Sequence, residues 1–409
     1  MAKCYTIRKR EAALVGFSEL ENEAFKIPEK IKGLARVTKI ADGVVSDNYT
    51  GPIVLPKTIT YISRKAIAGI ENITTRCDDS FNFTIIDGIL FYVTRRNYTL
   101  KNCKIPADVR VIAEDSLSQL RFVDTLQIPS GVNRIIPRSL SYSSFRKIIL
   151  KKSIKYIERF GICNNGQLET LILPNKLYEL GMGALSDNPN LTKLHLPKNI
   201  VNIPHSLLKG DSSLREVELP PNLKTIGNSA FWGCGIEKLD VPDSVEQIYP
   251  SAFCSTVYLK EIRLPSKLIE LSLDLFWGSG LQSITIPKGV RRISSGVFHK
   301  CFRLKEVIFE EGSVCEEIGQ GAFMGCTKLK EIKLPETISK IGLSAFADCT
   351  QLEEITIPSR LLMNKSFIIH NPRMLDPNNL NHSFDIFFKC NNLKRIYSTD
   401  RSILYEYEM

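Results

Sequence analysis

The chain has 409 residues, 43% of them hydrophobic, so it can bury a large core. Its formal net charge of +10 arises from 54 Lys and Arg residues against 44 Asp and Glu residues. Because the basic residues form short clusters among acidic ones, and no apolar run reaches the roughly 20 residues of a membrane span, we expect no nucleic-acid partner and no membrane insertion.

The first 36 residues are predicted to cap the amino-terminal end of a larger β structure. Two short β-like runs lie at residues 5–7 and 13–17. Such a cap is needed wherever a stack of strands would otherwise expose its core and an unpaired strand edge. Met1 is followed by basic residues but by no apolar core of signal-peptide length, so no signal peptide is visible.

Between residues 37 and 358, an apolar run that closes on a proline dipeptide recurs at a fixed period. The dipeptides are Leu55-Pro56, Ile105-Pro106, Ile128-Pro129, Leu173-Pro174, Leu196-Pro197, Leu219-Pro220, Val241-Pro242, Leu264-Pro265, Ile286-Pro287, Leu334-Pro335 and Ile357-Pro358. From Leu173 to Ile286 the steps are 23, 23, 22, 23 and 22 residues. A constant period of this size indicates a solenoid, and we predict about a dozen coils.

The coil that contains Pro335 shows why the repeat predicts strands. Ile332 and Leu334 alternate with polar residues, as in a strand with one buried face, and Pro335 ends that strand because it has no N–H to donate. Ile338 then returns the chain to the core, and Phe346 enters it from the far side. We therefore predict a mainly β repeat solenoid with one parallel sheet, and short turns or helical segments on the opposite side.

Two segments interrupt the repeat. Near residues 76–104, the Asp87-Gly88 pair between two β-rich runs predicts a hairpin insertion with a tight turn. After Pro358, residues 364–381 are rich in Asn and Pro and predict a loop or an irregular last coil. Residues 403–409 are the candidate for the carboxy-terminal cap, so that residues 359–409 form the irregular end of the chain.

The coil pattern L-x-x-I-x-L-P-x-x-L-x-x-I-G-x-x-A-F-x-x-C resembles the BspA-type leucine-rich repeats of bacterial and protozoan surface proteins. It is clearest in residues 214–234 and 329–349 and, with a longer step, in residues 304–326. The resemblance covers roughly residues 27–400. It implies a leucine-rich-repeat right-handed superhelix, a role in adhesion or binding, and a place at the cell surface or outside the cell, but it transfers no catalytic residue.

Six of the eleven cysteines follow a phenylalanine by three residues, namely Cys163, Cys234, Cys301, Cys326, Cys349 and Cys390. This regularity predicts a column of small buried thiols at one turn of each coil. A disulfide between neighbouring coils stays open as an alternative for Cys301, Cys326 and Cys349, because coils stack at about the Cα spacing that a disulfide requires. No C-x-x-C pair is present, so we expect neither a zinc site nor a cofactor.

The five histidines are scattered and have no serine, cysteine or carboxylate at a catalytic spacing. The outward strand positions also lack the long carboxylate column that a polysaccharide-cleaving solenoid would need. We therefore expect a protein that is not an enzyme and that binds a protein or glycan partner, as a monomer, through the exposed sheet face. An intracellular interaction scaffold is the alternative, and a polysaccharide-acting enzyme is a distant third.

The core alternation also predicts which strand residues face solvent. Ile149 and Ile172 are expected to be neighbours with a basic rim, which could form a binding hot spot or an incidental apolar pair. The charged positions from Glu216 to Arg263 are read more simply as cross-strand pairs. The candidate binding face comprises Lys147, Ile149, Thr170, Ile172, Lys193 and His195.

Overall fold

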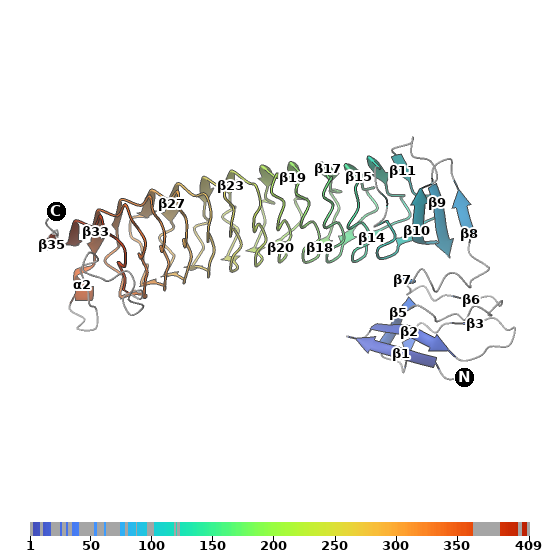
Figure 1. The fold of residues 1–409 in the computed structure, drawn as a ribbon, viewed down its shortest axis with the longest axis horizontal. Helices are drawn as coiled ribbons and strands as arrows, with labels where there is room; N and C mark the ends of the chain where they lie inside the picture. Colours follow the sequence, from blue (N-terminus) through green and yellow to red (C-terminus); the bar gives the residue numbers. More distant parts are fainter. Residues whose placement is uncertain are drawn as a thin grey trace. The chain divides into compact units, whose positions relative to one another are not determined.

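The computed structural model describes residues 102–117, 120, 123–362, 385–399 and 403–406, together with the strands and Gly88 that precede residue 102. This part of the chain forms a mainly β solenoid of about 11 turns with parallel sheets, whose strands are labelled in Figure 1. The chain divides into two compact units, Met1–Leu168 and Glu169–Met409. No helix among the described residues is long and apolar enough to cross a membrane. The expected division at residues 36 and 358 stays a prediction.

The first unit begins with short strands that cover the predicted runs at residues 5–7 and 13–17. β1 pairs with β2 antiparallel, and β2 pairs parallel with β5, which also pairs with β4 and β7. The bounds are β1 (Lys3–Arg8), β2 (Glu11–Phe17), β3 (Phe25–Lys26), β4 (Lys30–Ile31), β5 (Ala35–Ile40), β6 (Ile53–Val54) and β7 (Tyr61–Ile62).

An antiparallel sheet follows where the insertion was expected. β8 (Thr74–Cys77) pairs with β9 (Phe81–Ile86), which pairs with β10 (Ile89–Arg95). Gly88, between β9 and β10, has a φ of 75°, which a residue without Cβ adopts without strain; Asp87 lies outside the described residues. β10 then pairs parallel with β12 (Val111–Ile112), so the hairpin joins directly onto the stack of coils.

The described coils of the first unit each contribute a longer strand of three residues, which we call a wide strand, and a two-residue strand. The wide strands β11 (Asn102–Lys104), β13 (Thr125–Gln127) and β15 (Lys147–Ile149) pair parallel and in register. Their central residues Cys103, Leu126 and Ile148 are buried, while the residues on either side face outward. The two-residue strands β14 (Arg134–Ile135) and β16 (Tyr156–Ile157) form a second parallel ladder.

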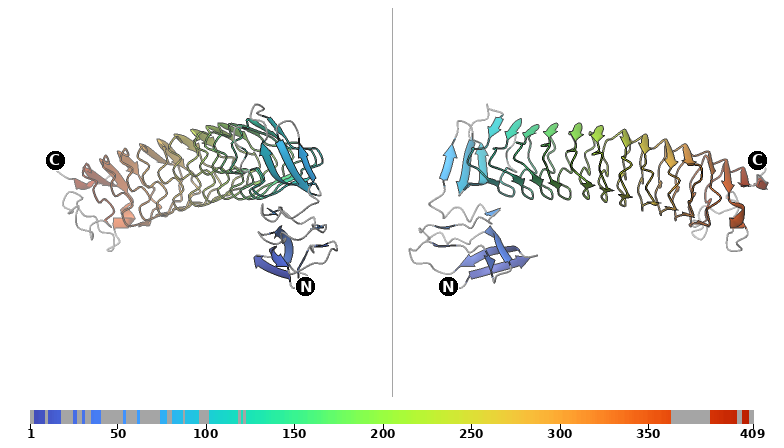
Figure 2. Two further views of the ribbon diagram at one scale, coloured as in Figure 1. Left: turned by 45° about the vertical axis from the view of Figure 1, so that its right-hand side comes forward. Right: turned by 180° about the vertical axis from the view of Figure 1, so that it is seen from behind.

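The second unit repeats this arrangement, with wide strands along one edge and two-residue strands along the other in both views of Figure 2. The wide strands are β17 (Thr170–Ile172), β19 (Lys193–His195), β21 (Glu216–Glu218), β23 (Lys238–Asp240), β25 (Glu261–Arg263), β27 (Ser283–Ile286), β29 (Glu306–Phe309), β31 (Glu331–Lys333) and β33 (Glu354–Ile357). The two-residue strands are β18 (Glu179–Leu180), β20 (Asn202–Ile203), β22 (Thr225–Ile226), β24 (Gln247–Ile248), β26 (Glu270–Leu271), β28 (Arg292–Ile293), β30 (Glu317–Ile318) and β32 (Lys340–Ile341). The solenoid fold is confirmed, and the two-residue strands from β14 to β32 form three further short parallel sheets that were not predicted from the sequence.

Turns form the third side of each coil and are themselves hydrogen-bonded to the next coil. The N–H groups of Phe231 and Gly233 donate to the carbonyls of Ala252 and Cys254, at 2.8 and 2.9 Å. The chain forms tight turns on this side, in which residues such as Ser229 and Gly233 adopt a left-handed backbone conformation, with φ of 53° and 65°. The backbone groups of this side are therefore satisfied without a helix.

A column of stacked phenylalanines fills the core behind these turns. Phe231, Phe253, Phe276, Phe298, Phe323, Phe346 and Phe387 are each fully buried. Neighbouring rings have centroids 5.1 to 5.9 Å apart and planes within 21° of parallel. Each ring thus packs on the ring of the coil before and after it, which links the coils along the whole column.

Five of these phenylalanines are followed three residues later by a cysteine whose thiol is buried, as predicted, and forms no disulfide. These cysteines are Cys234, Cys301, Cys326, Cys349 and Cys390. Four of these thiols donate to the carbonyl of a phenylalanine in the preceding coil, as in Cys326 to Phe298 at 3.2 Å and Cys349 to Phe323 at 3.1 Å, whereas the thiol of Cys234 donates to the carbonyl of Leu214 at 4.0 Å. Burial raises the thiol pKa, for Cys301 to about 12, so the thiol keeps the proton that it donates. The structure therefore shows a column of inter-coil hydrogen bonds rather than disulfides.

Cys163 is buried too, but it occupies a different position in its coil. Tyr142 N–H donates to the carbonyl of Cys163 as Gly210 N–H donates to that of Trp232, so Cys163 corresponds to Trp232 rather than to Cys234. The spacing after Phe160 is misleading because Phe160 is the left-handed turn residue, with a φ of 54°, and Ile162 enters the core instead. In this coil, Asn165 occupies the position that Cys234 and the later cysteines of the column occupy in their own coils.

The second unit ends in a change of strand direction. β33 pairs parallel with β34 (Arg395–Ser398), and β34 pairs antiparallel with β35 (Ile403–Glu406). β35 thus covers an edge of β34, in the segment expected to form the carboxy-terminal cap. The one helix among the described residues is α2 (Ser359–Leu362), directly after β33. The loop expected at residues 364–381 lies outside the described residues.

Candidate binding site

The structure places the six predicted residues on the outer face of three wide strands, in two units. Lys147 and Ile149 lie on β15 in the first unit, where Lys147 is exposed and Ile149 is half-buried. The other four lie on β17 and β19 in the second unit and are all exposed. The predicted contact of Ile149 with Ile172 stays a prediction.

Within the second unit, strand register aligns these residues in rows. Thr170 lies opposite Lys193, and Lys193 lies opposite Glu216. Two residues further along the strands, Ile172 and His195 face outward in the same way, and His195 lies opposite Glu218. Ile172 is 68% exposed, which makes it one of the two most exposed large hydrophobic residues in the part described. Ile172 therefore lies on the outer face of its strand without being packed into the core.

Ile172 borders a hollow of about 350 Å³, which we call the Ile172 hollow. Its floor is made by the leucines of three successive closing dipeptides, Leu173, Leu196 and Leu219, which are 6 to 9% exposed, together with Pro197 and Pro220. The lining also contains the exposed Pro221, which follows Pro220 where most other coils have a polar residue. From the sequence these dipeptides were expected only to end strands, and the double proline was the available signal that this coil differs.

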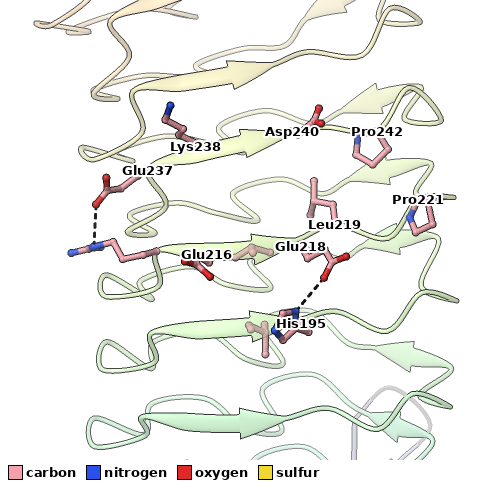
Figure 3. Close-up of a pocket in the computed structure, with 12 residues that line it drawn as sticks. His195, Glu216, Glu218, Leu219, Pro221, Glu237, Lys238, Asp240 and Pro242 are labelled. Atoms are coloured by element: carbon pink, nitrogen blue, oxygen red, sulfur yellow. Dashed lines mark hydrogen bonds and ion pairs between the residues drawn. The ribbon is translucent and has the colours of Figure 1, made fainter.

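A larger hollow of about 910 Å³ continues from the first along the sheet (Figure 3). The two hollows share His195, Glu218, Leu219 and Pro221. In Figure 3, His195 and Glu218 face each other across neighbouring strands, with 3.2 Å between His195 Nδ1 and Glu218 Oε2. Together the two hollows extend from β17 to β23 and form one shallow, continuous surface.

The charges that border this surface are paired with one another. Lys193 contacts Glu216 at 3.1 Å, and Lys238 contacts Glu261 at 2.9 Å. Beside them, a hydrogen bond from Lys260 lowers the pKa of the Glu237 carboxyl. The expected reading of these positions as cross-strand pairs is confirmed. Because exposed pairs contribute little to stability, they chiefly keep the sheet soluble while leaving the apolar hollow as its distinctive feature.

The side chains that line this surface are suited to binding a partner by non-covalent contacts. His195 has about 65% of its side chain exposed, and Glu218 about 74%, so both groups remain hydrated. No group of three or more His, Cys, Asp or Glu residues that could hold a metal ion occurs in the described part of the chain. The lining of the Ile172 hollow is mainly apolar, whereas seven of the twelve residues that line the larger hollow are polar or charged, so the surface combines an apolar part with a polar part, as protein interfaces do.

A stack of 22- to 23-residue coils with buried leucines, an aromatic column and parallel sheets defines a leucine-rich-repeat protein. The sequence matches the BspA type leucine rich repeat region in six overlapping copies that together run from residue 17 to residue 405. The chain therefore belongs to the BspA-type leucine-rich-repeat family, as its coil pattern indicated. No curated protein matches the sequence.

Several solved bacterial structures are similar to this chain. A leucine-rich repeat protein from Bacteroides ovatus has a TM-score of 0.52 and 22% identity, over 79% of this chain and 94% of that one. A leucine rich cell surface protein from Faecalibacterium prausnitzii has a TM-score of 0.40 and 21% identity, over 86% and 92% of the two chains. The pneumococcal vaccine antigen PcpA has a TM-score of 0.45 and 19% identity, over 80% and 89%. At this identity, the first of these supports the fold alone.

Proposed function

We propose that this protein is a non-enzymatic binding protein that recognises a partner protein, in an adhesive role, through the sheet face around the Ile172 hollow. The observation that carries the proposal is the exposure of Ile172 beside a hollow whose floor contains the closing leucines of three successive coils. A large apolar side chain held at the edge of an apolar hollow is the usual centre of a binding interface.

The chemistry of the hollow favours a protein partner. Eight of its twelve lining residues are aliphatic or proline, and His195 is the one aromatic ring among them. Aliphatic surface gains free energy by burying apolar side chains, whereas a sugar needs more directional polar partners than this floor offers. The coils are linked by backbone and aromatic contacts, so little conformational freedom is lost on binding. The cell surface or the extracellular space is the compartment that suits this role.

Ile172→Glu is expected to weaken binding about tenfold or more, because it places a charge in the apolar centre of the interface. The measurement is a screen of the labelled chain against arrays of purified matrix proteins and defined glycans, followed by titration of each protein that binds. Val201→Glu is the matched control, because Val201 is also exposed, at 46%, but lies next to the two-residue strand β20 rather than on a wide strand.

The control should bind within about twofold of the unaltered chain, and both variants should unfold at the same temperature. Equal binding by Ile172→Glu and the unaltered chain would end the proposal. Binding to glycans alone, or to no protein on the array, would also count against it.

A further inference from the structure

A separate hollow of about 1230 Å³ lies over β29, β31, β33 and β34 of the second unit. We call it the lysine hollow, because four lysines line it: Lys305, Lys328, Lys330 and Lys333. All four are exposed. It shares no residue with the hollows over β17 to β23. It is therefore a second surface on the row of wide strands, formed by other strands than those around Ile172.

Among the described residues, none of the four lysines has a carboxylate within ion-pair distance. Two of the four glutamates that line the hollow are held by other cations, Glu353 by Lys394 at 2.7 Å and Glu354 by Arg395 at 3.3 Å. The hydrogen bond from Lys394 is the main cause that lowers the pKa of Glu353, and the charge of Lys330 contributes least.

Earlier coils of the second unit arrange the charges of their wide strands differently. There, Lys193 and Lys238 each contact a glutamate on the neighbouring strand, at 3.1 and 2.9 Å. In the lysine hollow the corresponding strand positions are occupied by Glu306, Glu331 and Glu354. Glu331 lies directly opposite Glu354 in the strand register. Like charges directly opposite one another are destabilising, so this stretch is not arranged for the stability of the sheet itself.

The hollow also has apolar positions. Ile308 is 45% exposed on β29, and Tyr397, which lies opposite Thr356 on β33, is half-buried. Both line the hollow together with the lysines. An aromatic ring and a branched aliphatic side chain give a ligand area to bury, while the lysines supply the charge.

We propose that the lysine hollow binds an acidic segment of a partner protein, with Asp or Glu side chains over Lys328 and Lys330 and an apolar side chain against Ile308. Four unpaired lysines against two unpaired glutamates favour an acidic ligand by charge complementarity. The glutamates select against a uniform polyanion, because Glu306 and Glu331 would repel the sulfates of a glycan. An acidic peptide can present a lysine, an amide or an apolar residue at those points.

The test selects peptides from a random dodecapeptide phage library on the immobilised full chain. The peptide recovered most often is then synthesised and titrated by fluorescence anisotropy against three proteins: the unaltered chain, Lys328→Glu/Lys330→Glu, and Lys267→Glu/Lys288→Glu. The last is the matched control, since Lys267 and Lys288 are exposed lysines that line none of the three hollows. A heparin hexasaccharide is titrated in parallel.

Selected peptides should be enriched in Asp and Glu and should bind the hollow variant about tenfold more weakly or worse. They should bind the control and Ile172→Glu within about twofold of the unaltered chain, which separates this surface from the Ile172 hollow. The proposal is overturned if no acidic peptide is enriched, if the hollow variant binds equally well, or if heparin alone shows the dependence on Lys328 and Lys330. Circular dichroism of each variant confirms that the coils are intact.

Discussion

Replacing Phe323 by alanine is expected to lower the free energy of unfolding by about 3 to 5 kcal/mol, the usual cost of removing a buried phenylalanine. Phe323 is fully buried, and its ring stacks on those of Phe298 and Phe346, with both pairs of centroids 5.1 Å apart. The substitution removes two stacking contacts and leaves a cavity that the coils cannot close, because backbone hydrogen bonds hold their spacing. Urea unfolding monitored by circular dichroism measures the effect.

Phe323→Leu is the matched comparison for this substitution. Leu208 occupies the equivalent buried position in an earlier coil, so the column accepts leucine. We expect the leucine variant to lose less than half as much stability as the alanine variant, since leucine fills most of the cavity. Similar losses for both variants would show that ring stacking, rather than filled volume, dominates. A loss below about 1 kcal/mol for alanine would contradict the account of the column.

Replacing Asp211 by asparagine is expected to stabilise the protein at neutral pH. Asp211 is fully buried, and its Oδ1 accepts from the Asn188 N–H at 2.8 Å. Its Oδ2 has no hydrogen-bond partner among the described residues. In the equivalent position of the first unit, the amide of Asn165 accepts from Ser143 N–H and donates to the carbonyl of Leu140. An amide at position 211 can make the same pair of bonds, with a gain of about 1 to 3 kcal/mol.

The pH dependence follows from the direction of the pKa shift. Burial, above all, raises the pKa of Asp211 well above its ordinary value of 3.8, and the charge of Asp187 adds to the rise. Folding therefore favours the protonated form of Asp211, and the contribution of this residue to stability falls as pH increases from about 4 towards its raised pKa. The advantage of Asp211→Asn should be smallest below pH 4 and grow by up to about 1.4 kcal/mol per pH unit across that window.

Thermal unfolding of both proteins from pH 3.5 to pH 8 tests this dependence. Asp348→Asn is the control, because Asp348 is a partly exposed turn residue whose φ of 58° asparagine also adopts. It should change the free energy of unfolding by less than about 0.5 kcal/mol at every pH. A constant difference between wild type and Asp211→Asn, or a variant less stable at pH 7 than at pH 4 relative to wild type, would refute the prediction.

The repeat itself could be predicted from the sequence because each coil obeys local rules. The alternation around Ile332 and the proline at position 335 specify a short half-buried strand, and the structure has β31 there. The two-residue strands were missed because two residues show no periodicity, and they become strands only when the next coil supplies hydrogen-bond partners. The register of Cys163 was wrong for a related reason, since spacing from a phenylalanine cannot reveal whether that phenylalanine enters the core.

The candidate site could be predicted only in part. Ile172 and His195 were assigned to the outer face from the period-2 alternation, and both are exposed there. The floor of the Ile172 hollow could not be foreseen, because it combines residues about 23 positions apart that meet through stacking. The lack of ion-pair partners for the lysines around Lys330, among the described residues, could not be predicted either, because an ion pair depends on how two long side chains reach across strands.

By itself, the sequence determined the coil, its period and the inward or outward direction of most strand residues, because these follow from chain geometry and the burial of apolar side chains within one repeat. The tertiary structure decided which outward residues become neighbours, which charges neutralise one another and where the sheet is hollowed. These properties arise between coils, where side chains from distant positions compete for the same space and partners. The period of the chain therefore predicts the fold, whereas the proposed binding surfaces depend on how the coils stack.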